Sequence, residues 1–324
     1  MKIRVNNIHE FNASSDASIL ESARRSLFTI EHSCLNGRCS ECKAKVVSGK
    51  IQMPNSQEGL SDNEVKNGYC LTCISVPLSD LELEEVRFIE GVLPEVRTIP
   101  AKISELEFLS QDVAKLTLRT PPNKRLDFIS GQYIDISVNG IKRSYSIASD
   151  PSDTSIELLI KNYPNGKFSN YLFHEAKVND LLRIEGPKGT YILPNRIPQR
   201  LLFVSTGTGI APNLSLIKNA ILQGRVEKSQ VTLIHGQRKA VEHVYSLDGK
   251  LQGIEVIKCN SRESSEGFSQ GYVQDAVKGL KFDINKTMVF ACGNPQMIND
   301  LKKQIIAMGL EEKKFKSDIF VSSN

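Results

Sequence analysis

The sequence lacks a long apolar run, a basic run, internal repeats and low-complexity segments. Without an apolar stretch of about 18 residues, no transmembrane helix is predicted, and we expect no signal peptide at the N-terminus. Lysine and arginine together number 41 against 37 acidic residues, a formal charge of +4. This excess is too small to indicate nucleic-acid binding. We therefore expect a protein that binds neither membranes nor nucleic acids.

Cysteine is scarce, but its positions are informative. Three of the seven cysteines, Cys34, Cys39 and Cys42, follow the spacing C-x4-C-x2-C, and Cys73 lies farther along the chain. Thiolates at this spacing are typical of plant-type [2Fe–2S] clusters. A zinc site is an alternative, although zinc sites usually pair two short knuckles, and four unrelated free cysteines are another. The cysteine usage favours a reducing compartment, the cytoplasm, over a disulfide scaffold.

The fourth cluster ligand is a choice between Cys70 and Cys73, which form a C-x-x-C pair. We predict Cys73, because it enters a run, residues 73–84, that reads as a strand leaving the site. Cys70 is interpreted as a buried, passive thiol. Gly37 supplies the sharp turn that a loop needs to wrap a cluster. The predicted metal ligands are therefore Cys34, Cys39, Cys42 and Cys73.

Residues 1–92 resemble a plant-type ferredoxin domain, which implies a β-grasp fold. The opening residues 1–5 look like an edge strand, and residues 18–27 like a short amphipathic helix with Ile19, Ala23 and Leu27 on one face. Residues 61–64 are a capping-box signature that predicts a second short helix. Two prolines within residues 91–100 predict a stiff linker to the remainder of the chain.

After the linker the predicted secondary structure is of two kinds, first mainly strands and then strands alternating with helices. The whole chain is therefore predicted to be a multidomain α+β and α/β protein. Residues 97–197 are rich in short strands, which predicts a small antiparallel barrel. In residues 198–324 strands alternate with helices, which predicts a parallel sheet of the nucleotide-binding type. The predicted strands lie at residues 101–108, 113–118, 133–138, 143–148, 155–161, 181–185, 201–204, 231–235, 254–258, 287–291 and 319–321, and the predicted helices at 212–223, 272–278 and 295–308.

Three motifs in the predicted barrel have residue types suited to a flavin. Arg143 offers a guanidinium for a pyrophosphate, Tyr145 a flat ring and Ser146 a hydroxyl. Residues 166–169, Gly-Lys-Phe-Ser, open a helix where an anion can bind. Residues 185–189, Glu-Gly-Pro-Lys-Gly, come next.

In this order the three motifs resemble the flavin-binding barrel of the ferredoxin–NADP reductase superfamily. The resemblance implies that Tyr145 packs on the flavin ring and that Ser146 lies near its redox nitrogen. It also implies FAD rather than FMN as the flavin. The phosphate-binding residues that it implies are Arg143, Gly166, Lys167 and Ser169.

A further motif, residues 205–212 with the sequence Ser-Thr-Gly-Thr-Gly-Ile-Ala-Pro, follows a predicted strand and opens a helix. Its glycines and the helix N-terminus suit a diphosphate, although it is not a full G-x-G-x-x-G fingerprint. The superfamily resemblance extends to residues 236–238 and 292–295, and it implies Ser146 and Cys292 as catalytic residues. The implied nucleotide contacts are Gly207, Thr208, Gly209, Pro212, Arg238, Cys292, Gly293 and Phe320.

The choice between NADH and NADPH depends on few residues. Arg238 and the pair Ser261 and Arg262 could bind a 2′-phosphate, or they could be solvated loop residues. We favour NADH, because the closest overall resemblance is to NADH enzymes, and NADPH stays an alternative.

The predicted domains cover essentially the whole chain and resemble the reductase components of bacterial oxygenases. A closer likeness is to the CDP-6-deoxy-delta-3,4-glucoseen reductases of deoxysugar synthesis. The resemblance implies that hydride passes from NAD(P)H to FAD, and that single electrons then pass to the cluster and to a partner protein. The implied partner is a CDP-deoxysugar 3-dehydrase of 3,6-dideoxysugar synthesis, with an aromatic-ring or alkane oxygenase component as the alternative. A non-catalytic electron carrier or sensor protein built on the same domains is a third alternative.

Overall fold

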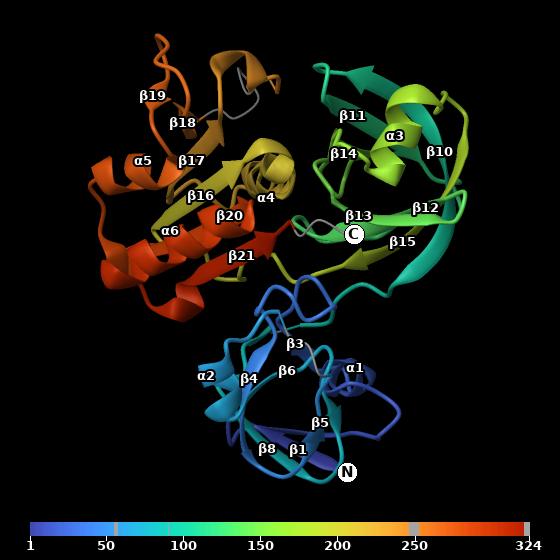
Figure 1. Ribbon diagram of the computed structural model, residues 1–324, viewed down its shortest axis with the longest axis vertical. Coiled ribbons are helices and arrows are strands. Elements are labelled where there is room, and N and C mark those ends of the chain that lie inside the picture. The colour runs from blue at the N-terminus through green and yellow to red at the C-terminus, as the bar shows by residue number, and fades with distance from the viewer. Residues whose placement is uncertain (55–57, 90, 246–252, 321–324) are drawn as a thin grey trace. The chain divides into compact units, whose positions relative to one another are not determined.

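The computed structural model describes residues 1–54, 58–89, 91–245 and 253–320, and the chain divides into two compact units, Met1–Leu93 and Pro94–Asn324 (Figure 1). The division falls close to the boundary predicted at residue 92. The predicted linker is too long, because Pro100 lies inside strand β10 (Arg97–Phe108), opposite Arg183 of β15 (Leu181–Lys188). None of the helices in the described ranges is long and apolar enough to cross a membrane.

The first unit is a β-grasp ferredoxin fold on a five-stranded mixed sheet in the order β2-β1-β8-β4-β6. Strand β1 pairs antiparallel with β2 and parallel with β8, so the prediction of an edge strand is wrong. Its parallel partner comes from far along the chain, and a local pattern cannot indicate such a pairing. The strands are β1 Lys2–Val5, β2 His9–Asn12, β3 Thr29–Ile30, β4 Lys43–Ser48, β5 Ile51–Gln52, β6 Tyr69–Leu71, β7 Val76–Pro77, β8 Leu81–Glu84 and β9 Phe88–Ile89.

Two short helices complete this unit. Helix α1 (Ile19–Arg25) is capped by Ser18, whose Oγ accepts from the Glu21 amide at 3.1 Å, and it buries Ile19 and Ala23. Leu27 lies beyond the helix end with φ +58° and is 75% exposed, so its predicted place on the buried face is wrong. Helix α2 (Asp62–Lys66) begins with the predicted capping box. The run after Cys73 forms two separate short strands, β7 and β8, rather than one.

The second unit begins with a nearly closed antiparallel barrel, in which all six predicted strands are present. The strand order is β13-β12-β15-β10-β11-β14, and an isolated bridge between Ile147 and Leu158 joins the two ends of that order. Its core contains fully buried aliphatic side chains such as Ile103, Leu116 and Ile134. The remaining elements are β11 Val113–Arg119, β12 Tyr133–Val138, β13 Ile141–Ser146, β14 Ile156–Lys161 and α3 Lys167–His174.

A parallel sheet follows in the order β19-β18-β17-β16-β20-β21, with helices between its strands as predicted. The last strand begins earlier than predicted, because Phe315 and Ser317 already alternate into the buried face; Val321 of the predicted strand lies outside the described residues. The bounds are β16 Arg200–Thr206, α4 Ile210–Leu222, β17 Gln230–Gln237, β18 Glu255–Asn260, β19 Ser269–Gln270, α5 Val273–Gly279, β20 Thr287–Gly293, α6 Pro295–Ala307 and β21 Phe315–Ile319.

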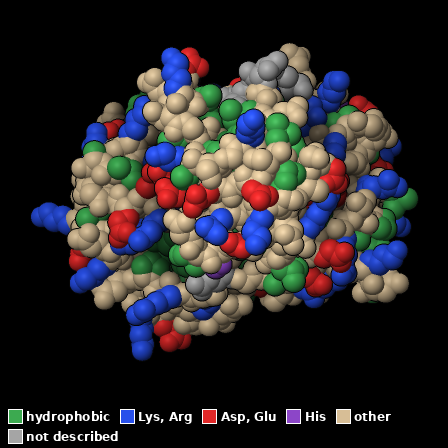
Figure 2. All heavy atoms as spheres, turned by 90° about the horizontal axis from the view of Figure 1, so that it is seen from below, with side chains coloured by type: hydrophobic (Ala, Val, Ile, Leu, Met, Phe, Trp, Pro, Cys, Tyr) green, Lys and Arg blue, Asp and Glu red, His purple; other side chains and the backbone are tan. Residues whose placement is uncertain are grey.

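Charged side chains are mixed in sign on the surface. On the face drawn in Figure 2, Lys and Arg side chains are interspersed with Asp and Glu side chains. That face therefore carries no single large patch of one charge.

Candidate functional site

The loop that carries the first three cysteines runs between β3 and β4 and is sharply folded. Leu35, Gly37 and Ser40 all have positive φ, at +58°, +80° and +62°. A Cβ on Gly37 would lie 2.5 Å from the Ile74 side chain, so a larger residue there would be strained and would collide. Two non-glycine residues in the left-handed region are costly, and the sequence gives no signal of them.

The thiols of the predicted ligands gather in two pairs. Cys34 lies beside Cys39, whose Sγ accepts from the Cys34 amide at 3.4 Å, and the Cys39 thiol together with loop amides lowers the pKa of Cys34 to about 6. Cys42 lies beside Cys73, and this neighbour and burial raise the pKa of Cys42. Cys70, by contrast, is fully buried in the core, and burial raises its pKa to about 12.

Paired thiols fit a two-iron cluster better than a single ion. Within the described ranges, no three His, Cys, Asp or Glu side chains are arranged to hold one metal ion, as a tetrahedral zinc site would need. Two pairs instead offer two thiolates to each of two irons. The four-cysteine ligand set stays a prediction that this geometry favours.

The flavin motifs come together where β13 meets α3. The rings of Tyr145 on β13 and Phe168 on α3 lie 5.2 Å apart, and burial raises the pKa of Tyr145. Gly166 precedes α3 and has no side chain to cap it, so the first amides of the helix and Lys167 are suited to a phosphate. The Ser169 hydroxyl bonds to the Gly166 carbonyl at 3.0 Å and stabilises this turn, while the Arg143 guanidinium donates to the Lys142 carbonyl at 2.7 Å.

Ser146 and Cys292, the two predicted catalytic residues, meet at a residue that the sequence analysis missed. The Ser146 hydroxyl donates to the Asp318 carboxylate at 3.0 Å, and the same carboxylate oxygen lies 3.9 Å from the Cys292 Sγ. Burial and Asp318 raise the pKa of Cys292 well above its usual range, so this residue is a neutral thiol. The predicted last strand begins at Ile319, so Asp318 lies outside every predicted element, whereas β21 begins at Phe315.

The nucleotide motifs lie at the carboxyl edge of the parallel sheet. Strand β16 is flanked by β17 and β20, so the chain reverses its direction of progress across the sheet between β16 and β20. Ligands of open α/β sheets bind at such a switch point. There Gly209 packs on the end of β20, since a Cβ on it would lie 2.6 Å from the Cys292 carbonyl, while Gly207 faces open space. Pro212 lies in the first turn of α4, and the Phe320 amide bonds to the Gly293 carbonyl at 3.0 Å.

Arg238 and Arg262 lie side by side farther along this edge. The Arg262 amide donates to the Arg238 carbonyl at 2.9 Å, and the Ser261 hydroxyl donates to the Gln237 carbonyl at 3.3 Å. Both arginine side chains are exposed. The structure therefore brings together the residues that could bind a 2′-phosphate.

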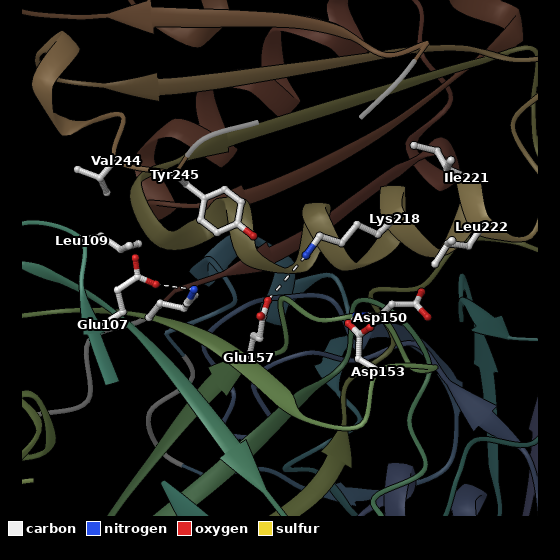
Figure 3. A pocket seen from close by; sticks show the side chains of 11 residues that line it. Glu107, Leu109, Asp150, Asp153, Glu157, Lys218, Ile221, Leu222, Val244 and Tyr245 are labelled. Atoms are coloured by element: carbon white, nitrogen blue, oxygen red, sulfur yellow. Dashed lines mark hydrogen bonds and ion pairs between the residues drawn. The ribbon is translucent and has the colours of Figure 1, made fainter. Parts of the chain in front are cut away.

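A cavity of about 520 Å³ lies between the barrel and α4, and none of the predicted site residues lines it (Figure 3). Lys115 pairs with Glu107 at 2.5 Å and Lys218 with Glu157 at 3.9 Å. Asp150 has one buried carboxylate oxygen without a hydrogen-bond partner, but that oxygen is closed off from solvent. We assign no cofactor to this cavity.

Comparisons with known proteins define the class. The family model described as "2Fe-2S iron-sulfur cluster binding domain" matches residues 3–78, "Oxidoreductase FAD-binding domain" matches 100–192, and "Oxidoreductase NAD-binding domain" matches 203–303. The chain is 36% identical to the CDP-6-deoxy-L-threo-D-glycero-4-hexulose-3-dehydrase reductase of Yersinia pestis, over 97% of this chain and 96% of the relative. It is 33% identical to the propane 2-monooxygenase reductase component of Mycolicibacterium goodii, over 90% and 88%.

The chain therefore belongs to the iron–sulfur flavoprotein reductases of the ferredoxin reductase type. It is an NAD(P)H-dependent oxidoreductase with domains for a [2Fe–2S] cluster, FAD and NAD, and it serves an electron-accepting partner. A cytochrome P450 reductase of Amycolatopsis has the same fold, with a TM-score of 0.79 and 24% identity over 99% of both chains. These findings confirm the predicted fold class, cofactors and enzyme class, while the individual site residues stay predictions.

Proposed function

We propose that this chain is the reductase of a CDP-6-deoxyhexulose 3-dehydrase, and that it supplies the electrons for 3,6-dideoxysugar synthesis. One observation carries the proposal: the chain matches the Yersinia pestis dehydrase reductase from end to end, at higher identity and coverage than the propane monooxygenase reductase.

The roles of the chain's own residues follow from the geometry. The flavin that these residues would hold would supply two-electron acceptance of hydride and one-electron release, which suits a one-electron cluster. Gly207 and Gly209 would let the nucleotide diphosphate approach the start of α4, and Cys292 would border the nicotinamide. Asp318 accepts the single hydroxyl proton of Ser146 at the end of β13, so the serine oxygen would face the flavin ring as a hydrogen-bond acceptor. The two thiol pairs would hold the cluster.

The test is electron transfer to purified partners under anaerobic conditions. With NADH, the reductase should support turnover by a CDP-6-deoxyhexulose 3-dehydrase and should support a propane monooxygenase hydroxylase far less. Cys39→Ser is the matched control, since loss of a cluster ligand should stop transfer to the partner while NADH still reduces the flavin. Faster reduction of the hydroxylase than of the dehydrase would contradict the proposal.

A reductase component of an alkane or aromatic-ring oxygenase is the second candidate. It is favoured by the 33% identity to the Mycolicibacterium goodii component, and the same pair of assays separates the two. NADH is proposed as the donor. We also propose a cytoplasmic location, which the seven free cysteines support, because disulfides rarely persist there.

A further inference from the structure

A buried charged triad lies beside the cluster loop in the first unit. The Arg87 guanidinium contacts the Glu41 carboxylate at 2.7 Å and the Glu41 carbonyl at 3.1 Å, and it lies 3.6 Å from the Glu31 carboxylate. The two glutamate side chains are only 10% and 9% exposed. Carboxylates are rarely buried unless they are paired, and the same arginine pairs with both of these.

The triad connects separate parts of the loop. Glu41 directly precedes the predicted ligand Cys42, and Glu31 lies just before Cys34. Arg87 comes from the far end of the unit, next to β9, and its carbonyl accepts from the Glu31 amide at 2.8 Å. The arginine side chain therefore fixes the start of the loop and its end to one point, on either side of the residues with positive φ.

We propose that Arg87 is a positioning residue for the iron–sulfur cluster, and that the Arg87–Glu31–Glu41 triad sets the cluster's reduction potential. The proposal rests on the four-cysteine ligand set of the proposed function. Reduction adds one electron, and hence one negative charge, to a group already bounded by four thiolates. Each nearby carboxylate opposes that charge and the guanidinium favours it, so the triad as a whole makes the cluster harder to reduce.

The size of the effect follows from Coulomb's law. A unit charge within about 10 Å, at an effective dielectric constant of about 20, changes the ratio of reduced to oxidised cluster roughly tenfold at a fixed potential. For a one-electron couple, tenfold corresponds to about 59 mV. Because the carboxylates are buried, salt should screen this effect little.

The test is a redox titration of the full-length holoprotein, followed by electron paramagnetic resonance of the reduced cluster. Glu41→Gln keeps the shape of the side chain and removes one negative charge. The ratio of reduced to oxidised cluster at a fixed potential should therefore rise about tenfold, which is a rise of about 59 mV in the reduction potential. Arg87→Gln should lower it, and Arg87→Lys should stay close to wild type, since the charge is kept. Glu10→Gln is the control, because Glu10 pairs with Lys2 and Arg4 on the exposed side of β2 and should leave the potential unchanged.

Iron and acid-labile sulfide are measured in every variant. Loss of iron from Arg87→Gln would support the positioning role, and Glu41→Gln then still reports the charge effect. The proposal is overturned if Glu41→Gln holds a full cluster and titrates at the wild-type potential, because the triad would then be a structural ion pair only. A wild-type protein with zinc and no labile sulfide would instead contradict the proposed function.

Discussion

Asp318 offers the sharpest test of the site, because its carboxylate joins the two predicted catalytic residues. In Asp318→Asn the side-chain oxygen can still accept from Ser146, but the charge is lost. A hydrogen bond to a charged group contributes about 1.5–3 kcal/mol, roughly twice or more what a neutral one does. What the variant loses is the difference between the charged and the neutral bond, about 1–1.5 kcal/mol. If the charged bond is needed to hold the hydroxyl during hydride transfer, the rate should fall about five- to tenfold, since each 1.36 kcal/mol is tenfold.

The assay is anaerobic stopped-flow reduction of the flavin by NADH, with loss of flavin absorbance as the signal. The pKa of Cys292 gives a second measurement: burial raises it, and the Asp318 charge adds to that effect, so the Asn variant should alkylate faster at high pH. Asp300→Asn, the same change on the exposed side of α6, should alter neither. Wild-type flavin reduction in Asp318→Asn with full flavin content would refute the assigned role.

Three further predictions address the cofactors. Cys39→Ser should lose labile sulfide and cytochrome c reduction while it keeps NADH–ferricyanide activity; loss of both activities with flavin retained would show that the order of electron flow is wrong. Arg143→Ala should weaken flavin binding about ten- to over a hundredfold, from the 1.5–3 kcal/mol of a charge-assisted bond, and unchanged retention on dilution would place the flavin elsewhere. Arg262→Ala should leave kcat/KM for NADH nearly unchanged, and a wild-type preference for NADPH that collapses in this variant would reverse the choice of nucleotide.

Much of the fold could be predicted because its signals are local. The barrel strands alternate, the long helices begin and end at Pro and Gly positions, and Ser61 and Glu64 form the expected capping box. The wrong predictions concern strand pairings between distant segments and the exact residue at which a helix ends. The partner of β1 on its second side comes from the other end of the unit, and Leu27 leaves the helix face because the helix ends first.

The site shows the same division between local motifs and long-range contacts. Motifs with a fixed spacing, such as the cysteine triplet, could be located from the sequence. Asp318 and the Arg87 triad could not, because each acts through contacts between segments far apart in the chain. The Ser146–Asp318 bond spans 172 residues and the Arg87–Glu41 bond 46. A buried carboxylate gives no sequence signal that distinguishes it from an exposed one.

Helix α4 explains why the flavin and nucleotide motifs can act as one site. It begins directly after the loop of Gly207 and Gly209, and farther along it the Ser215 hydroxyl donates to the Ser149 carbonyl at 2.7 Å. Ser149 lies three residues beyond Ser146, whose side chain is held from the other side by Asp318. The segment that carries Ser146, the predicted flavin contact, is thus fixed by the helix behind the predicted nucleotide loop and by the strand beside Cys292. Hydride transfer requires reacting atoms about 3–3.5 Å apart, and hydrogen bonds at both ends of a four-residue segment are a direct way to maintain such a distance.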